Sequence, residues 1–218
     1  MAKFSLSNVN STAVTRLQPW TINEVAYRGI EVKSGKTKDG KEWKALQFKF
    51  SGDAGVFEPM IFCPQEGGDE RMTGTSNGKE WQLPSALEQL IFTISHVVGV
   101  LAPANLEKLK TVEFDLPKDF DKLCELIRKS LKSSENKTTK IKLVGDSKGY
   151  ATLPQFININ KDGDAYISNN WLGDNLAFTP YEITRKEKQA KAKPTEMNES
   201  PELDPDSSSD NSDLDFEI

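Results

Sequence analysis

The stretch "SGKTKDGKEWKALQFKF", residues 34–50, predicts a β-hairpin that is both basic and aromatic. Asp39-Gly40 at its centre is typical of hairpin turns, because both positions tolerate positive φ. After the turn, apolar side chains at Leu46, Phe48 and Phe50 alternate with polar ones, as in a strand with one buried face. Residues 22–33 show the same alternation before the turn. Two antiparallel strands are therefore expected to pair across residues 38–41.

The elements around this hairpin indicate a mainly β protein with a helical insertion at about residues 84–133. Further strands are expected at residues 56–62, 139–144, 150–159 and 165–171, the last two joined by the turn Asp162-Gly163. Lys140 and Lys142 are expected to point outward, and residues 65–83 to form a long loop. A capping box at Ser85 and Glu88 predicts a helix that ends at Pro103, and a second helix is expected over 118–132. This order favours an OB-fold-like antiparallel barrel of five or more strands, with a small α+β sheet protein as the alternative.

Charge divides the chain into two parts. The net charge is −5, but all 28 Lys and Arg lie at or before Lys193, where 24 acidic residues leave a surplus of +4. Residues 194–218 carry nine acidic and no basic residues. We expect residues 1–184 to form one folded domain and residues 185–218 a disordered linker with an acidic interaction tail.

The side chains that most catalytic sites require are scarce. His96 is the one histidine and lies inside a predicted helix, Cys63 and Cys124 stand far apart, and no phosphate-binding glycine loop is present. We therefore predict no catalytic residue, no metal and no cofactor. The start of the chain shows no signal peptide, and its longest apolar run is too short to span a bilayer, so a cytoplasmic protein is expected.

The outward face of the hairpin combines an aromatic ring with cations. Bases of single-stranded nucleic acid stack on aromatic side chains, while Lys and Arg neutralise the phosphates. The sequence therefore predicts a binding surface for a single strand. Its predicted residues are Arg28, Lys33, Lys36, Lys38, Lys41, Trp43, Lys44, Gln47, Lys49, Lys79, Trp81, Lys140 and Lys142.

The layout of the chain, with Lys36–Phe50 in a basic body and Asp210–Ile218 in an acidic tip, resembles the replicative single-stranded DNA-binding proteins of bacteria and their phages. The body is similar to the diverged phage forms. The resemblance implies sequence-independent protection of single-stranded DNA in replication, recombination and repair, in the cytoplasm of a phage-infected bacterium. It also implies that the tail recruits a DNA polymerase, helicase or primase. The partner-binding residues would be Asp213, Asp215, Phe216, Glu217 and Ile218.

The opposite charges of body and tail suggest that the tail folds back over the basic surface and competes with DNA. Two other functions stay open at this point. One is an RNA-binding chaperone of OB type, and the other is an acidic-tailed assembly chaperone that binds a basic protein and no nucleic acid.

Overall fold

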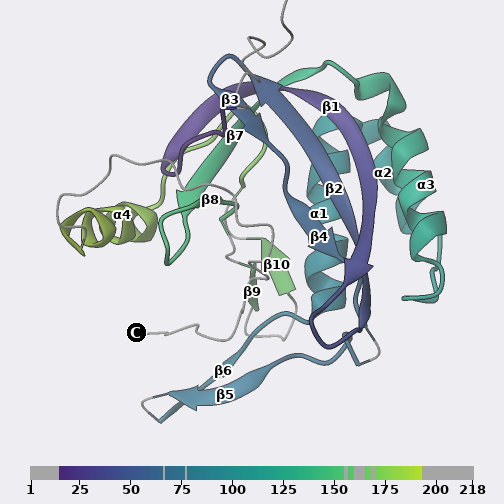
Figure 1. Cartoon of the computed structure of the whole chain (residues 1–218), viewed down its shortest axis with the longest axis horizontal. Helices are drawn as coiled ribbons and strands as arrows, with labels where there is room; N and C mark the ends of the chain where they lie inside the picture. Colours follow the sequence, from purple (N-terminus) through teal and green to yellow (C-terminus); the bar gives the residue numbers. More distant parts are fainter. Residues whose placement is uncertain are drawn as a thin grey trace, which may run out of the picture.

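The computed structural model describes residues 15–192, apart from 66, 77, 155–156, 160–164 and 168–169. Its main sheet is antiparallel and curls into a half-barrel of five strands in the order β3-β2-β1-β7-β8, with β4 also paired to β2 (Figure 1). These strands are β1 (Thr21–Lys36), β2 (Glu42–Gly52), β3 (Gly55–Phe57), β4 (Met60–Phe62), β7 (Thr138–Gly145) and β8 (Ala151–Thr152). The prediction of a mainly β protein with a helical insertion is confirmed.

The predicted hairpin is the β1–β2 pair, which is longer than expected. Its last paired residues are Lys36 and Glu42. In the turn, the Thr37 amide donates to the Lys41 carbonyl at 2.8 Å, and the Gly40 amide donates to the Thr37 carbonyl at 2.9 Å. Gly40 adopts φ +78°, a conformation that glycine reaches without strain. The Asp-Gly signal therefore marked the turn correctly.

The third strand, expected as one continuous element at 56–62, is divided into β3 and β4. Pro59 stands between them and has no N–H to donate to the ladder. Its carbonyl still accepts from the Phe48 amide at 3.0 Å. Both short strands consequently pair with β2, one on each side of the proline.

The prediction of a long loop at residues 65–83 was wrong. This segment contains β5 (Thr73–Ser76) and β6 (Lys79–Gln82), a two-stranded hairpin that projects from the body (Figure 1). Arg71 fixes its base by an ion pair of 2.5 Å with Glu88 at the start of the first helix. The strand Thr-Gly-Thr-Ser has no apolar alternation, so its local pattern carried no sign of a strand.

The predicted helices are present, and a third lies between them. They are α1 (Ala86–Leu101), α2 (Pro103–Lys110) and α3 (Phe120–Leu131), which the short 3-10 helix η2 (Lys132–Ser134) follows. Both bonds of the Ser85–Glu88 capping box form, at 3.1 and 2.8 Å. Pro103 ends α1 as predicted but also opens α2, because proline fits the first turn of a helix. None of the described helices is long and apolar enough to cross a membrane.

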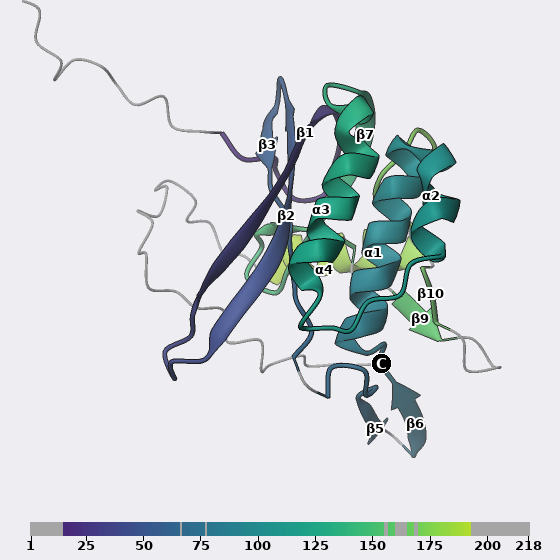
Figure 2. The ribbon, with the colours of Figure 1, turned by 90° about the vertical axis from the view of Figure 1, so that its right-hand side faces the viewer.

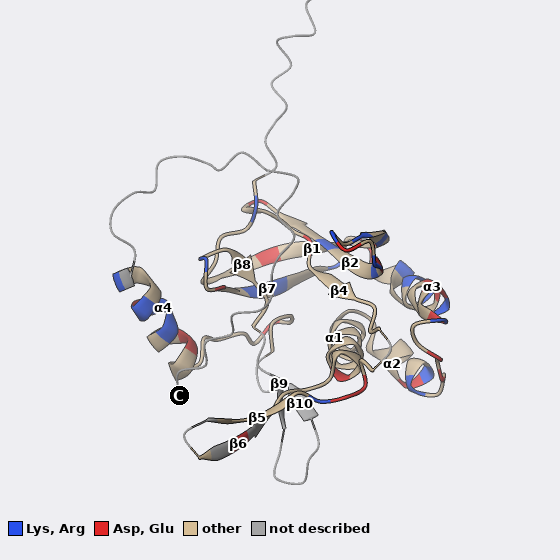
Figure 3. Cartoon of the chain, turned by 60° about the horizontal axis from the view of Figure 1, so that its bottom comes forward, with Lys and Arg blue, Asp and Glu red and all other residues tan. Residues whose placement is uncertain are grey.

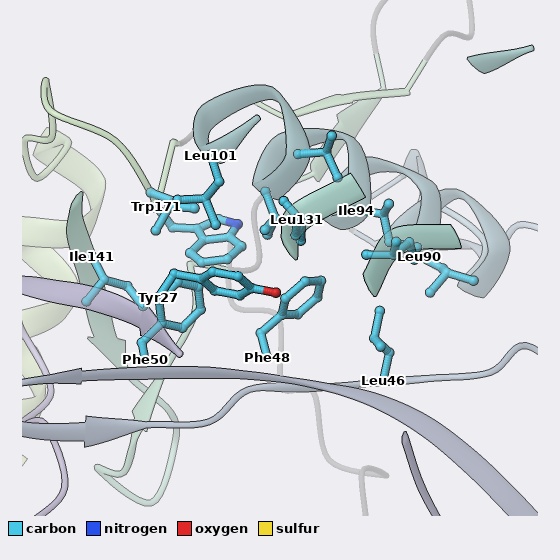
Figure 4. Packing of buried hydrophobic residues seen from close by; sticks show 14 of the residues in the cluster. Tyr27, Leu46, Phe48, Phe50, Leu90, Ile94, Leu101, Leu131, Ile141 and Trp171 are labelled. Atoms are coloured by element: carbon cyan, nitrogen blue, oxygen red, sulfur yellow. The ribbon is translucent and has the colours of Figure 1, made fainter. Parts of the chain in front are cut away.

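The core lies between the sheet and the helical insertion. Tyr27, Phe48 and Phe50 point from β1 and β2 toward Leu90 on α1 and toward Trp171 (Figure 4). The Phe50 ring stands at 89° to the ring of Trp171, with centroids 6.3 Å apart. Figure 2 shows α1, α2 and α3 on one side of the β1–β2 hairpin and none of them on the other. On the face of β1–β2 that turns away from these helices, Ala45 and Gln47 are covered, while the side chains of Lys33 and Lys49 are more than a third exposed.

The strand predicted at residues 150–159 is divided into β8 and β9 (Ile157–Ile159), which belong to different sheets, and the last helix was not predicted. β9 and β10 (Ala165–Ile167) pair antiparallel, as expected, although the turn at Asp162-Gly163 lies outside the described residues. Helix α4 (Pro180–Ala192) crosses the predicted domain limit at residue 184, so a folded element continues into the segment expected to be a linker. A capping box forms at the start of this helix. The Thr179 amide donates to Glu182 Oε2 at 2.7 Å, and the Glu182 amide donates to Thr179 Oγ1 at 3.2 Å. The motif Thr-Pro-Tyr-Glu at 179–182 is the local sequence signal that could have predicted this helix.

A buried ion pair joins α4 to β7. Lys142 alternates away from the core residues Ile141 and Leu143, as predicted, but it is only 1% exposed rather than solvated. Its ammonium lies 3.1 Å from the carboxylate of Glu182, which is 0% exposed, and donates to the Ala177 carbonyl at 3.0 Å. The outward orientation in solvent that was expected of Lys142 is therefore wrong, because α4 covers it.

His96 of α1 packs against the segment that contains Trp171 and Leu172. Its Nε2 atom accepts a hydrogen bond of 3.3 Å from the Leu172 amide, and its ring packs edge-on against Trp171 at 5.4 Å between centroids. Burial lowers the pKa of His96 below its ordinary value of 6.5. The neutral imidazole is therefore the form that the fold stabilises.

This burial predicts that the protein loses stability in mild acid. The unfolded chain binds the His96 proton at a higher pH than the folded chain, so the contribution is complete above about pH 6.5 and declines as the pH falls toward the lower folded-state pKa. Urea unfolding at pH 7.5 and at pH 5 should show the loss. A His96→Gln variant keeps an acceptor and should lose the part of the pH dependence that lies in this interval. If both proteins respond equally to pH, the assignment to His96 is wrong.

Candidate nucleic-acid interface

The side chains of β1–β2 that point away from the helices lie on one face of the hairpin, which we call the outer face. Cross-strand neighbours on this face are Glu31 with Gln47, Lys33 with Ala45, and Gly35 with Trp43. Strand β4 extends the face, since Phe62 pairs with Ala45 and Met60 with Gln47. The outer face thus joins residues from three strands.

An aromatic pair forms the centre of the outer face. The rings of Trp43 and Phe62 meet edge to face, with centroids 5.5 Å apart and planes at 70°. Phe62 is 52% exposed and Met60 beside it is 46% exposed, which is high for large apolar side chains on a sheet. Sequence reasoning found Trp43 and missed Phe62 and Met60. The signal was present, because Ile61 packs against the core and its two neighbours must then face outward.

Gly35 allows the indole of Trp43 to lie close against β1. A Cβ atom at this position would approach the Cζ2 atom of Trp43 to 2.7 Å, closer than real Cβ atoms come to any neighbour. The absence of a side chain at Gly35 therefore determines where the ring rests.

Three charged side chains beside the aromatic pair form a shared ion pair. The carboxylate of Glu31 lies 2.7 Å from Lys33 and 2.6 Å from Lys49. Hydrogen bonds from Lys33, which has the larger effect, and from Lys49 lower the pKa of Glu31 to about 2. All three side chains are more than a third exposed, so these contacts orient the lysines and contribute little to folding stability. Because two lysines share one carboxylate, this group carries one net positive charge.

The turn of the hairpin adds cations at the end of the outer face. Lys36 lies 3.6 Å from Glu42, and both side chains are largely exposed. Lys38 and Lys41 are exposed and have no ion pair with any residue that the structure describes. These two lysines can contact an anion without breaking an existing pair.

Arg28 marks the other end of the outer face. The register of β1 against β2 shifts between Tyr27 and Gly29, so Arg28 occupies a bulge. Its Nε atom donates to Ser51 Oγ at 2.7 Å, and a second guanidinium nitrogen donates to Asn136 Oδ1. Both acceptors are neutral, which leaves the positive charge of Arg28 uncompensated by these bonds.

Several residues predicted for the surface lie elsewhere. Lys44 points to the helical side and pairs with Asp121 of α3 at 2.5 Å. Gln47 is largely covered and lies 3.4 Å from the carboxylate of Glu58. Lys140 stands on β7 opposite Glu24, and Lys142 is buried beneath α4. Lys79 and Trp81 lie on β6, in a separate sheet, and their side chains are outside what the structure describes.

Of the predicted residues, Lys33, Trp43 and Lys49 lie on the outer face, Arg28 lies at its bulge, and Lys38 and Lys41 lie in the turn at its end. Lys36 follows the alternation of Val32 and therefore has the orientation of the helix-facing side, like Lys44. The tail residues Asp213, Asp215, Phe216, Glu217 and Ile218 lie outside the described residues. Within the described ranges, no group of three or more His, Cys, Asp or Glu is arranged to hold a metal ion. Cys63 and Cys124 are buried, and burial raises the pKa of both thiols.

Comparison with known proteins does not assign the chain to a family: no protein family, no curated protein and no solved structure matches it.

Proposed function

We propose that the chain binds single-stranded DNA on the outer face of β1–β2 without reading its sequence. The observation that carries this proposal is the Trp43–Phe62 pair, in which Trp43 is partly exposed and Phe62 is 52% exposed, with cations on both sides of it. Bases stack on such rings whatever their identity, and Lys or Arg neutralises the phosphates between them.

The proposal extends to the fold and to the tail. The half-barrel, with β1 paired to both β2 and β7 and a helical insertion before β7, supports an OB-type barrel. In this proposal the acidic segment 194–218 competes with DNA for the basic surface and, when displaced, recruits a polymerase, helicase or primase. The protein would then act in DNA replication, recombination and repair.

The direct test is a titration with oligo(dT), followed by the intrinsic tryptophan fluorescence at low and moderate salt. We expect quenching whose apparent affinity falls steeply with salt, because each phosphate contact releases counterions. Oligo(U) of the same length serves as the comparison, and tighter binding of oligo(U) would favour the RNA chaperone instead. Absence of quenching and of binding with both would favour the assembly chaperone.

Replacement of Glu31 by Gln is expected to strengthen oligo(dT) binding. The change removes a negative charge from the outer face and frees Lys33 and Lys49 to contact phosphates. One unit charge at 4 Å is worth about 1 kcal/mol in water, so a gain of roughly fivefold at low salt is expected. Glu107→Gln on α2, which removes a similar exposed Lys partner, is the matched control. Equal affinities for the two variants would contradict a role for Glu31 at the interface.

Removal of the acidic tail is also expected to strengthen binding. A chain ending at Pro194 lacks all nine acidic residues of the tail and keeps α4. It should bind oligo(dT) more tightly at low salt, and the difference should shrink as salt screens the attraction between tail and body. An unchanged affinity at low salt would show that the tail does not compete with DNA.

A further inference from the structure

A pocket of about 440 Å³ lies where β1 passes the end of α3. Residues 27–30 of β1, which include the bulge, form one wall. The other wall consists of Arg128, Lys129, Lys132 and Glu135, from the last turn of α3 and the segment after it. Arg28 lines the pocket and also lies at the bulge that marks the end of the outer face.

The balance of charge around the pocket is positive. Arg128 and Lys129 share one carboxylate, that of Glu125, at 2.7 and 3.6 Å. Lys132 pairs with Glu135 at 3.0 Å, while Arg28 is bonded to neutral oxygens. Four cations therefore face two carboxylates, and two positive charges remain.

Strand β7 ends its pairing with β1 just before the residues of β1 that line the pocket. β7 pairs with β1 only from Thr21 to Ala26, so after the Arg28 bulge this edge of β1 has no neighbouring strand among the described residues. A chain molecule lying along the outer face would meet the edge of the sheet at Arg28. Figure 3 shows Lys and Arg next to acidic residues along α3.

We propose that this pocket binds a phosphate group, and we assign that phosphate to the backbone of the single strand held on the outer face. Guanidinium groups suit phosphate because their planar donors make paired, charge-assisted hydrogen bonds, and the pocket contains two of them. The inference rests on the proposed function for its ligand. It directs the strand around the edge of β1 toward α3, rather than across β7 toward Lys140 and the buried Lys142.

The test compares two triple variants that lose the same charge. The pocket variant carries Arg128→Gln, Lys129→Gln and Lys132→Gln, and the control carries Lys108→Gln, Lys110→Gln and Lys118→Gln. All six side chains are exposed, so both variants should fold. If one or two phosphate contacts are lost, the slope of log K against log salt for oligo(dT) becomes shallower by about 0.7 to 1.4 in the pocket variant alone. At low salt the pocket variant should bind about tenfold more weakly than the control.

A second arm uses inorganic phosphate and no oligonucleotide. The amide resonances of Gly29 and Ile30 should shift saturably with phosphate in the unaltered protein and not in the pocket variant. Matching oligo(dT) affinities for the pocket and control variants would overturn the assignment, even if phosphate shifts these amides, and would leave the proposed function standing. If the unaltered protein does not bind oligo(dT), the proposed function fails, and the phosphate titration alone decides whether the pocket is an anion site. If phosphate also fails to shift these amide resonances, the inference is overturned completely.

Discussion

Replacing Trp43 and Phe62 together by Ala is expected to weaken oligo(dT) binding by at least about 30-fold. Each base stacked on an aromatic ring contributes roughly 1–3 kcal/mol, so loss of two rings removes about 2 kcal/mol or more. Every 1.4 kcal/mol changes the dissociation constant about tenfold. The salt dependence should change little, because the lysines and Arg28, which we propose to contact phosphates, are untouched.

Binding of the double variant is best followed by the fluorescence anisotropy of a labelled oligonucleotide, since Trp43 is itself a fluorophore of the protein. The matched control carries Tyr150→Ala and Ile91→Ala, two exposed apolar side chains that lie away from the outer face. The single variants Trp43→Ala and Phe62→Ala should each lose part of the affinity. If the double variant binds as tightly as the control, the aromatic pair is not a stacking surface and the proposed function loses its principal support.

Replacing Glu182 by Ala is expected to release α4 from the body. The change leaves the ammonium of Lys142 buried with the Ala177 carbonyl as its remaining hydrogen-bond acceptor among the described residues. Removal of one partner from a buried ion pair costs about 3–5 kcal/mol, because the other charge stays uncompensated in a medium of low polarity. The remaining contacts of α4 include hydrogen bonds of Gln189 with Trp20 at 2.9 Å and with the Asp146 carbonyl at 2.6 Å, which cannot offset such a loss.

Hydrogen exchange distinguishes release of α4 from unfolding of the whole chain. The amides of α4 should exchange at least about 100-fold faster in Glu182→Ala, while those of α1 and α3 keep their protection. Glu187→Ala removes an exposed carboxylate from the same helix and should have almost no effect. Lys142→Met combined with Glu182→Leu removes both charges and should restore most of the protection. Rapid exchange of α4 already in the unaltered protein would show that the ion pair does not hold the helix.

The Oε1 atom of Glu182 is buried and has no hydrogen-bond partner among the described residues, although Oε2 accepts from both Lys142 and Thr179. Such an arrangement is costly, and a pair of apolar residues in its place is often neutral or stabilising. The double replacement consequently has a second use, because it measures how much stability the pair itself supplies.

The elements that depend on local chemistry were predictable from the sequence. Asp39-Gly40 marked the hairpin, Ser85 and Glu88 marked the start of α1, and the apolar stripe from Phe120 to Leu131 marked α3. Each of these signals acts within a few residues, through turn geometry, capping bonds or the helical repeat. The alternation on β2 likewise placed Trp43 and Lys49 on the side away from the core.

Contacts between distant segments decided the rest. The position of Lys142 in the alternation of β7 is that of a solvated residue. It becomes part of a buried ion pair only because α4 packs over it and brings Glu182, 40 residues later in the sequence, beside its ammonium. Lys44 shares the strand face of Leu46 and Phe48, but only the packing of α3 supplies Asp121 as its partner. Phe62 meets Trp43 because β4 pairs with β2 beside Ala45. The amino-acid sequence by itself determined which faces of the strands are apolar and where turns and helices begin. Which outward residues meet, and which become covered, was decided by the tertiary structure, because burial depends on neighbours that no local pattern records.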